Sequence, residues 1–204
     1  FKTMDTRSSR EQLNKLAQEA GKLGIASQQA VIEYVEAADV INVALDELGE
    51  GATRDIGKLS SIYGDAERMG LGKAMLAVGA AINEVSQNST ASASYLVDFE
   101  NRMAGVGKQA DMSIPKIMGY ASVLDQNAQQ VEMSATALQG IIMKMYQDPG
   151  KLARIAGIDV KEFARLVRED ANEALLQLLD TLGKAGGMQA LAPMFDEMKL
   201  DGQF

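Results

Sequence analysis

The chain has 204 residues and a formal net charge of −8, from 20 Lys and Arg against 28 Asp and Glu. Cysteine and histidine are both absent, which excludes disulfides, thiolate catalysis, structural zinc and histidine-based acid–base chemistry. An acidic chain is repelled by phosphate backbones, so we expect no stable binding to nucleic acid. The longest uncharged apolar stretch covers residues 74–82 and is far shorter than the roughly 20 residues that span a bilayer.

Apolar residues recur with helical spacing along almost the whole chain. Leu71, Met75, Val78, Ile82 and Val85 follow one another by three or four positions and so share one side of a helix. No stretch shows the period of two that a half-buried strand requires. We therefore predict an all-α fold, an array of short to medium helices packed as helical hairpins, with no β-sheet. The expected helices cover residues 9–22, 27–48, 53–69, 71–87, 92–108, 113–126, 130–146, 150–156, 160–168, 171–184 and 188–198.

Capping residues mark where these helices start and stop. An acceptor side chain precedes a glutamate by three positions at Ser8 and Glu11, at Asp159 and Glu162, and at Asp170 and Glu173. This spacing lets the two residues satisfy each other's free backbone amides at a helix start. Glycines at positions 24, 49, 70 and 157 follow apolar runs, and we expect them to end helices in the left-handed conformation.

The helix restarts suggest an internal repeat. Branched residues that reopen a helix stand at Ile25, Leu71, Ile114 and Ile158, roughly 40 residues apart, a period typical of stacked helical hairpins. The alternative is a chance similarity between helices that are all rich in Ala and Leu. We divide the chain into an N-terminal helical hairpin in residues 1–50, which could continue from upstream sequence, and a helical domain in residues 51–204.

We find no convincing catalytic, cofactor-binding or metal-binding motif. The Gly-rich stretch 49–58 resembles a phosphate-binding loop, but Lys58 is followed by Leu59 instead of Ser or Thr, and no strand is expected before it. We therefore expect no enzyme activity, no cofactor, no metal and no small-molecule substrate.

One cluster of positive charge is a candidate for partner contact. It comprises Lys151, Arg154, Lys161, Arg165 and Arg168, and the last three share one side of a helix. Such a surface could meet an acidic partner or nucleic acid. Acidic residues are interleaved with it, so a helix face that is merely solvated is the alternative.

Five pieces of the chain, taken in their order, resemble one family. They are AINEVSQNS (81–89), SYLVDFENRMAGVGKQA (94–110), MSIPKIMGYASVLDQ (112–126), EMSATALQGIIMKM (132–145), and Gly-Ile-Asp at 157–159 followed by EFARLV (162–167). This order resembles the core region of tape measure proteins from long-tailed phages and prophages. Members of that family often carry a glycine near the end of the third piece, where this chain has Asn127, Ala128, Gln129 and Gln130.

The resemblance implies a structural protein of the virion tail that sets tail length during assembly of the tail tube in the host cytoplasm and takes part in genome delivery. It implies a tail tube protein and tail assembly chaperones as partners, with association of the chain with itself as a further option. Residues 51–204 would then be a tape-measure core-like domain. The alternative is a helical-repeat interaction scaffold of bacterial origin without catalytic activity. An enzyme based on carboxylates, Ser, Lys or Tyr would need an adjacent base that we do not find.

Overall fold

The computed structural model describes residues 6–49 and 51–184, and every regular element in this part of the chain is an α-helix. The all-α prediction is therefore confirmed, while the helix expected at 188–198 lies outside the described residues. The helices are α1 (Arg10–Lys22), α2 (Gln28–Ala44), α3 (Ala52–Ile62), α4 (Asp65–Met69), α5 (Leu71–Asn88), α6 (Ala93–Gln109), α7 (Ile114–Gln126), α8 (Val131–Gln147), α9 (Pro149–Ala156), α10 (Val160–Glu169) and α11 (Ala171–Lys184).

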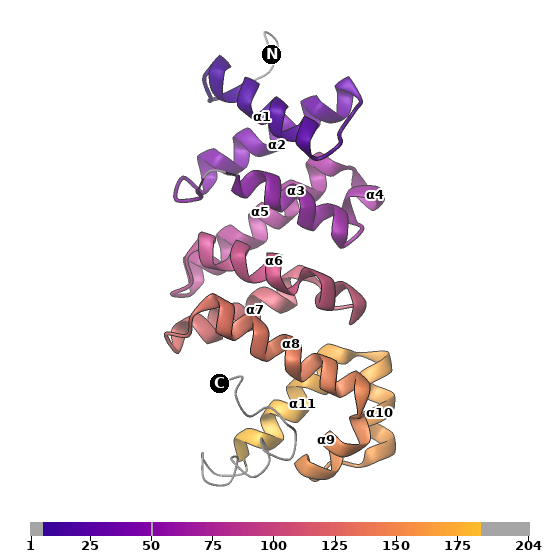
Figure 1. Ribbon diagram of the computed structural model, residues 1–204. Coiled ribbons are helices and arrows are strands. Elements are labelled where there is room, and N and C mark those ends of the chain that lie inside the picture. Colours follow the sequence, from indigo (N-terminus) through magenta and orange to yellow (C-terminus); the bar gives the residue numbers. More distant parts are fainter. Residues whose placement is uncertain (1–5, 50, 185–204) are drawn as a thin grey trace.

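The helices form a stack that runs from α1 at one end to α9, α10 and α11 at the other (Figure 1). The first hairpin is α1 with α2, the second is α3 and α4 with α5, and the third is α6 with α7. α3 contacts α6 and α6 contacts α8, while α2, α5 and α7 contact one another in succession. The stack therefore has two layers, and packing as hairpins is confirmed.

The hairpins recur at a nearly constant interval. The leading helices of the three hairpins and of the unit that α8 opens begin at residues 10, 52, 93 and 131, so each unit starts about 40 residues after the previous one, as in a helical solenoid. α9, α10 and α11 pack on one another and on α8. They close this end of the described stack with shorter helices.

The core is one continuous cluster of buried apolar side chains that extends from Leu13 in α1 to Leu182 in α11. Methionine contributes to it repeatedly. The side chains of Met75, Met103, Met112, Met118 and Met145 are all fully buried or nearly so. Unbranched thioether chains adapt to irregular gaps, which suits a core formed where many short helices cross.

α2 and α5 approach closely because α5 carries glycine at two contact positions. A Cβ on Gly72 would lie 3.1 Å from the carbonyl oxygen of Glu33, and one on Gly79 would lie 2.9 Å from Cγ1 of Ile41. The contacts ascend together in both helices, so α2 and α5 run parallel. This is the relation expected between equivalent helices of successive solenoid units.

Most predicted caps are present. Asp159 accepts the backbone N–H of Glu162 at 2.9 Å, and Asp170 accepts that of Glu173 at 3.0 Å. At α1 the prediction was one residue off, because Ser9 is the N-cap and forms a capping box with Gln12 instead of Ser8 with Glu11. Glycines 24, 70 and 157 have the positive φ of the prediction, but the ψ of 144° at glycine 70 lies outside the left-handed helical region. Glycine 49 does not have a positive φ, and glycine 51 has it instead.

Two predicted helices end earlier than expected. The helix predicted at 27–48 stops at Ala44, and the one predicted at 53–69 is broken into α3 and α4. The break lies at Gly64, whose φ of +81° suits a residue without a Cβ. Lys108 Nζ from α6 donates a hydrogen bond to the carbonyl oxygen of Tyr63 at 3.0 Å, which satisfies an acceptor at the end of α3.

Candidate functional site

Tyrosine hydroxyls connect helices of different units in the stack. The Tyr95 hydroxyl on α6 donates to the carbonyl oxygen of Gln129 at 3.2 Å and lies 3.3 Å from Oγ of Ser134 on α8. The Tyr120 hydroxyl on α7 donates to Oδ1 of Asn172 on α11 at 3.0 Å. Both hydroxyls therefore have neutral partners across a junction between units.

The junction between the first and second hairpins uses a shared carboxylate. Oε2 of Glu19 on α1 accepts hydrogen bonds from the Tyr34 hydroxyl on α2 at 3.2 Å and from Thr53 Oγ1 on α3 at 3.3 Å. Burial, followed by the nearby charge of Glu19, raises the pKa of Tyr34. Glu19 itself is only half-buried, so water can bond the carboxylate oxygen that the two donors do not use.

The junction between the second and third hairpins differs, because its acid is fully buried. Glu100 on α6 has an exposed fraction of 0%. Its Oε2 accepts a long hydrogen bond of 3.4 Å from the Tyr63 hydroxyl, and its Oε1 has no hydrogen-bond partner among the described residues. Burial raises the pKa of Glu100 well above its ordinary range, and the Tyr63 bond opposes this only in part. We call this pair the Tyr63–Glu100 junction.

A glycine two turns further along the same face of α6 makes room for the junction. A Cβ on Gly107 would overlap Cδ1 of Ile117 and would come within 2.5 Å of the Tyr63 hydroxyl oxygen. Tyr63 is therefore held between Glu100, Gly107 and, through its carbonyl oxygen, Lys108. All three partners belong to α6, so a stretch of about two turns of that helix fixes the end of α3.

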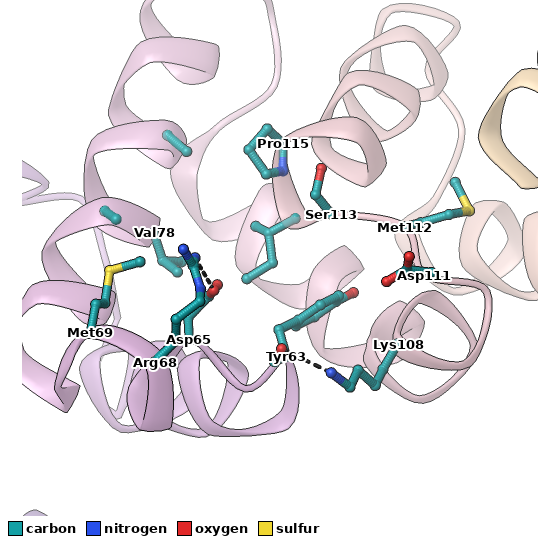
Figure 2. Close-up of a pocket in the computed structure, with 13 residues that line it drawn as sticks. Tyr63, Asp65, Arg68, Met69, Val78, Lys108, Asp111, Met112, Ser113 and Pro115 are labelled. Carbon is teal, nitrogen blue, oxygen red and sulfur yellow. Dashed lines mark hydrogen bonds and ion pairs between the residues drawn. The ribbon is translucent and has the colours of Figure 1, made fainter. Parts of the chain in front are cut away.

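A pocket of about 350 Å³ opens beside this junction. Figure 2 shows Asp65 and Arg68 on one side, Asp111 and Met112 on the other, and Tyr63 between them. Arg68 and Asp65 form an ion pair at 2.6 Å. The remaining lining is largely apolar and comes from the end of α4, from α5 and from the start of α7: Met69, Ala77, Val78, Ala81, Ile114 and Pro115, together with Lys108 and Ser113.

The five basic residues predicted as a partner-contact face lie on two helices that pack together, α9 and α10. Arg154, Lys161, Arg165 and Arg168 are exposed, and Lys151 is half-buried. Arg165 forms an ion pair with Glu169 on its own helix. The structure thus presents these residues to solvent, and their contact with a partner stays a prediction.

Glu100 was not singled out from the sequence, although a signal for it exists. It lies three residues before Met103 and four after Leu96, both of which are fully buried. That spacing places the carboxyl on the apolar side of α6. An acid at such a position means either that the buried side of the helix has been assigned wrongly or that the carboxyl is itself buried. Only the packing of the folded chain distinguishes the two.

The described residues were also compared with the requirements of a metal site and of a membrane-spanning helix. No three carboxylates come together among them where a metal ion could be held. None of the described helices is both long and apolar enough to cross a membrane.

Comparison with protein families places residues 2–198 in a family described as phage-related minor tail protein. Comparisons with curated proteins and with solved structures gave no match. The matched span covers nearly all of the chain, from before α1 to beyond α11. The chain therefore belongs to the phage-related minor tail protein family, and its role is a structural one in the phage tail.

Proposed function

We propose that this chain is part of a tape measure protein, which sets tail length during assembly of the tail tube and takes part in genome delivery. Membership of the minor tail protein family supports a place in the tail. The ordered resemblance of residues 81–167 to tape measure cores supports the finer assignment. The observation that carries it is the repeat, because hairpins that begin at residues 10, 52, 93 and 131 divide the chain into nearly equal increments of length.

The amount of length per hairpin depends on the conformation inside the tail. As a continuous helix, residues 93–130 would account for about 57 Å at 1.5 Å per residue. As a folded hairpin in the stack, the same residues would advance the structure by about 10 Å, the distance between packed helices. The two conformations therefore predict tail lengths that electron microscopy can distinguish.

The experiment is an in-frame deletion of residues 93–130 in the gene that encodes the chain, followed by measurement of tail length. The deletion removes the third hairpin and joins Ser92, a helix N-cap, to the start of α8. Tails shortened by about 57 Å would support a ruler in extended form, and tails shortened by about 10 Å a ruler in folded form. Tails of normal length would refute the proposal and indicate an accessory module.

A matched control separates length from stability. Gly107→Ala disturbs the packing of the same hairpin without removing residues. Under the proposal this variant gives tails of normal length, even where fewer particles form. Shortened tails in the control would show that tail length responds to damage of the hairpin and not to the number of residues.

We also propose that the chain works without catalysis and that its partners are the tail tube protein and tail assembly chaperones in the host cytoplasm. The basic residues of α10 are a contact surface for an acidic patch on one of them. Charge reversal in Lys161→Glu with Arg168→Glu should then abolish co-purification at low salt. Lys73→Glu, at an exposed position on α5, is the control. Equal co-purification by the unmodified chain, the double variant and the control would rule out this surface as a partner contact.

A further inference from the structure

The junctions of the stack are not equally well satisfied. At the junction of α6 with α8, the Tyr95 hydroxyl has two partners, the Gln139 side chain donates to the carbonyl oxygen of Arg102, and Arg102 pairs with Glu132 at 2.8 Å. At the Tyr63–Glu100 junction, Lys108 donates to the Tyr63 carbonyl oxygen at 3.0 Å, but the Glu100 carboxyl accepts only one long bond of 3.4 Å and its other oxygen is unpartnered. Among the described residues, this is the junction that buries a carboxyl oxygen without a hydrogen-bond partner.

Ionisation of Glu100 inside this junction would be costly, since a buried charge needs an opposite charge or several donors. The charged or titratable residues on the helices that contact α6 are Arg54, Asp55, Lys58, Lys73, Glu84, Lys116, Tyr120, Asp125, Glu132, Lys144 and Tyr146. None of these residues forms a hydrogen bond or an ion pair with Glu100. Tyr63 is its sole partner among the described residues. On α6 itself, Lys108 is bonded to the Tyr63 carbonyl oxygen and Arg102 to Glu132, and neither forms a hydrogen bond or an ion pair with Glu100. No cation among the described residues is therefore paired with the carboxylate.

We propose that the Tyr63–Glu100 junction is a proton-controlled joint at which the stack opens, separating α1–α5 from α6–α11. With its proton, the Glu100 carboxyl fits the closed junction. Without it, the buried charge is relieved when α3 moves away from α6 and water reaches the carboxylate. The joint thus gives a tail protein a defined place to change from a compact stack to a longer form.

The direction of the pH dependence follows from where the proton is held. In the closed junction, burial raises the pKa of Glu100 well above the ordinary value of 4.5, so the closed form keeps a proton that the open form has lost. Opening therefore releases a proton and becomes more favourable as pH rises from about 4.5 towards the raised pKa. Within that window the opening equilibrium increases up to tenfold per pH unit.

Hydrogen exchange measured by mass spectrometry on the whole chain, at pH 5.5 and pH 7.5, tests the joint. Protection factors, which remove the intrinsic pH effect on exchange, are compared for peptides from α3, α6 and α8. We expect protection in α3 and α6 to fall by about tenfold or more between the two pH values. The fall should be smaller in α8, whose main contacts are with α6, α7 and α9 and not with α3.

Two variants assign the effect to the carboxyl. Glu100→Gln keeps the shape of the side chain and removes its titration, so the fall in protection should disappear. Asp98→Asn changes an exposed acid on the same helix and should behave as the unmodified chain does. A fall that survives in Glu100→Gln, or that is equal in all helices, would overturn the proposal.

A third variant covers the case in which Glu100→Gln does not fold. Tyr63→Phe removes the one hydrogen-bond donor to the carboxyl and keeps the ring that lines the pocket. Under the proposal, its protection in α3 and α6 at pH 7.5 is lower than that of the unmodified chain. Unchanged protection in this variant would show that the junction does not control opening.

Discussion

The close packing around Gly107 leads to a sharp prediction, because α6 also carries a glycine that packs against nothing. Gly107→Ala would place a methyl group against Cδ1 of Ile117 and within 2.5 Å of the Tyr63 hydroxyl oxygen, whereas a Cβ on Gly105 has no neighbour within 4 Å. Both substitutions exchange glycine for alanine in the interior of the same helix. The difference between them therefore isolates the effect of packing.

The magnitude follows from two opposing contributions. Alanine is favoured over glycine in a helix interior by about 1 kcal/mol, and both variants receive this gain. At Gly107 the added methyl group overpacks a site where Ile117 is fully buried, which costs typically 1–3 kcal/mol, an order-of-magnitude range. Gly105→Ala should thus gain about 1 kcal/mol, and Gly107→Ala should lie roughly 1–3 kcal/mol below it.

Urea denaturation followed by circular dichroism at 222 nm measures both free energies of unfolding in one experiment. The midpoint should rise for Gly105→Ala and fall, relative to it, for Gly107→Ala, with unchanged slopes. If the two variants were stabilised equally, α3 and α6 would not be in contact at this position, and the arrangement of Tyr63 against α6 would be refuted.

Three further predictions concern a helix cap, a buried acid and a strained backbone position. Ser92→Ala removes the side chain that caps α6 and should lower the midpoint of urea unfolding by the equivalent of about 1 kcal/mol; Ser113→Ala, at an N-cap without such a bond, should leave it almost unchanged. Buried Asp39 accepts hydrogen bonds from two backbone N–H groups that precede α1, both at 3.0 Å. Asp39→Ala should therefore lower the free energy of unfolding by about 3 kcal/mol and speed proteolysis of the segment before α1. Equal rates of proteolysis in the variant and the unmodified chain would contradict this. Ala128 has a φ of +56°, and Ala128→Gly should therefore raise stability by about 1 kcal/mol, seen as a higher melting temperature in a thermal scan.

The positions of the described helices could be predicted from the sequence, because the spacing of apolar residues shows which side of each helix faces the core. The helix ends could not be predicted where the same residues allow a helix either to continue or to stop. Tyr63-Gly64 could equally continue a helix with a tolerated glycine or end one, and the deciding contact, Lys108 with the Tyr63 carbonyl oxygen, comes from 45 positions away in the sequence. The early end of α2 at Ala44 is a similar case, since residues up to 48 keep the helical pattern.

The two candidate sites also differ in how far they could be predicted from the sequence. The basic residues of α9 and α10 could be found from the sequence, because charges on the exposed side of a helix need no packing information. The Tyr63–Glu100 junction could not, because it depends on which helix of one hairpin meets which helix of the next. The glycine that the resemblance leads one to expect near Ala128 now has a physical reason, since the chain there adopts a positive φ that glycine tolerates best.

Contacts between immediate neighbours in the stack have a mechanical consequence. Each hairpin packs on the unit before it and the unit after it, so a force applied at one end of the described chain acts on the contacts of one hairpin at a time. The work needed is then spread over a series of small steps instead of one large barrier. Such a chain can be drawn through a narrow passage in stages, and can emerge from the ribosome and fold in the same piecewise order.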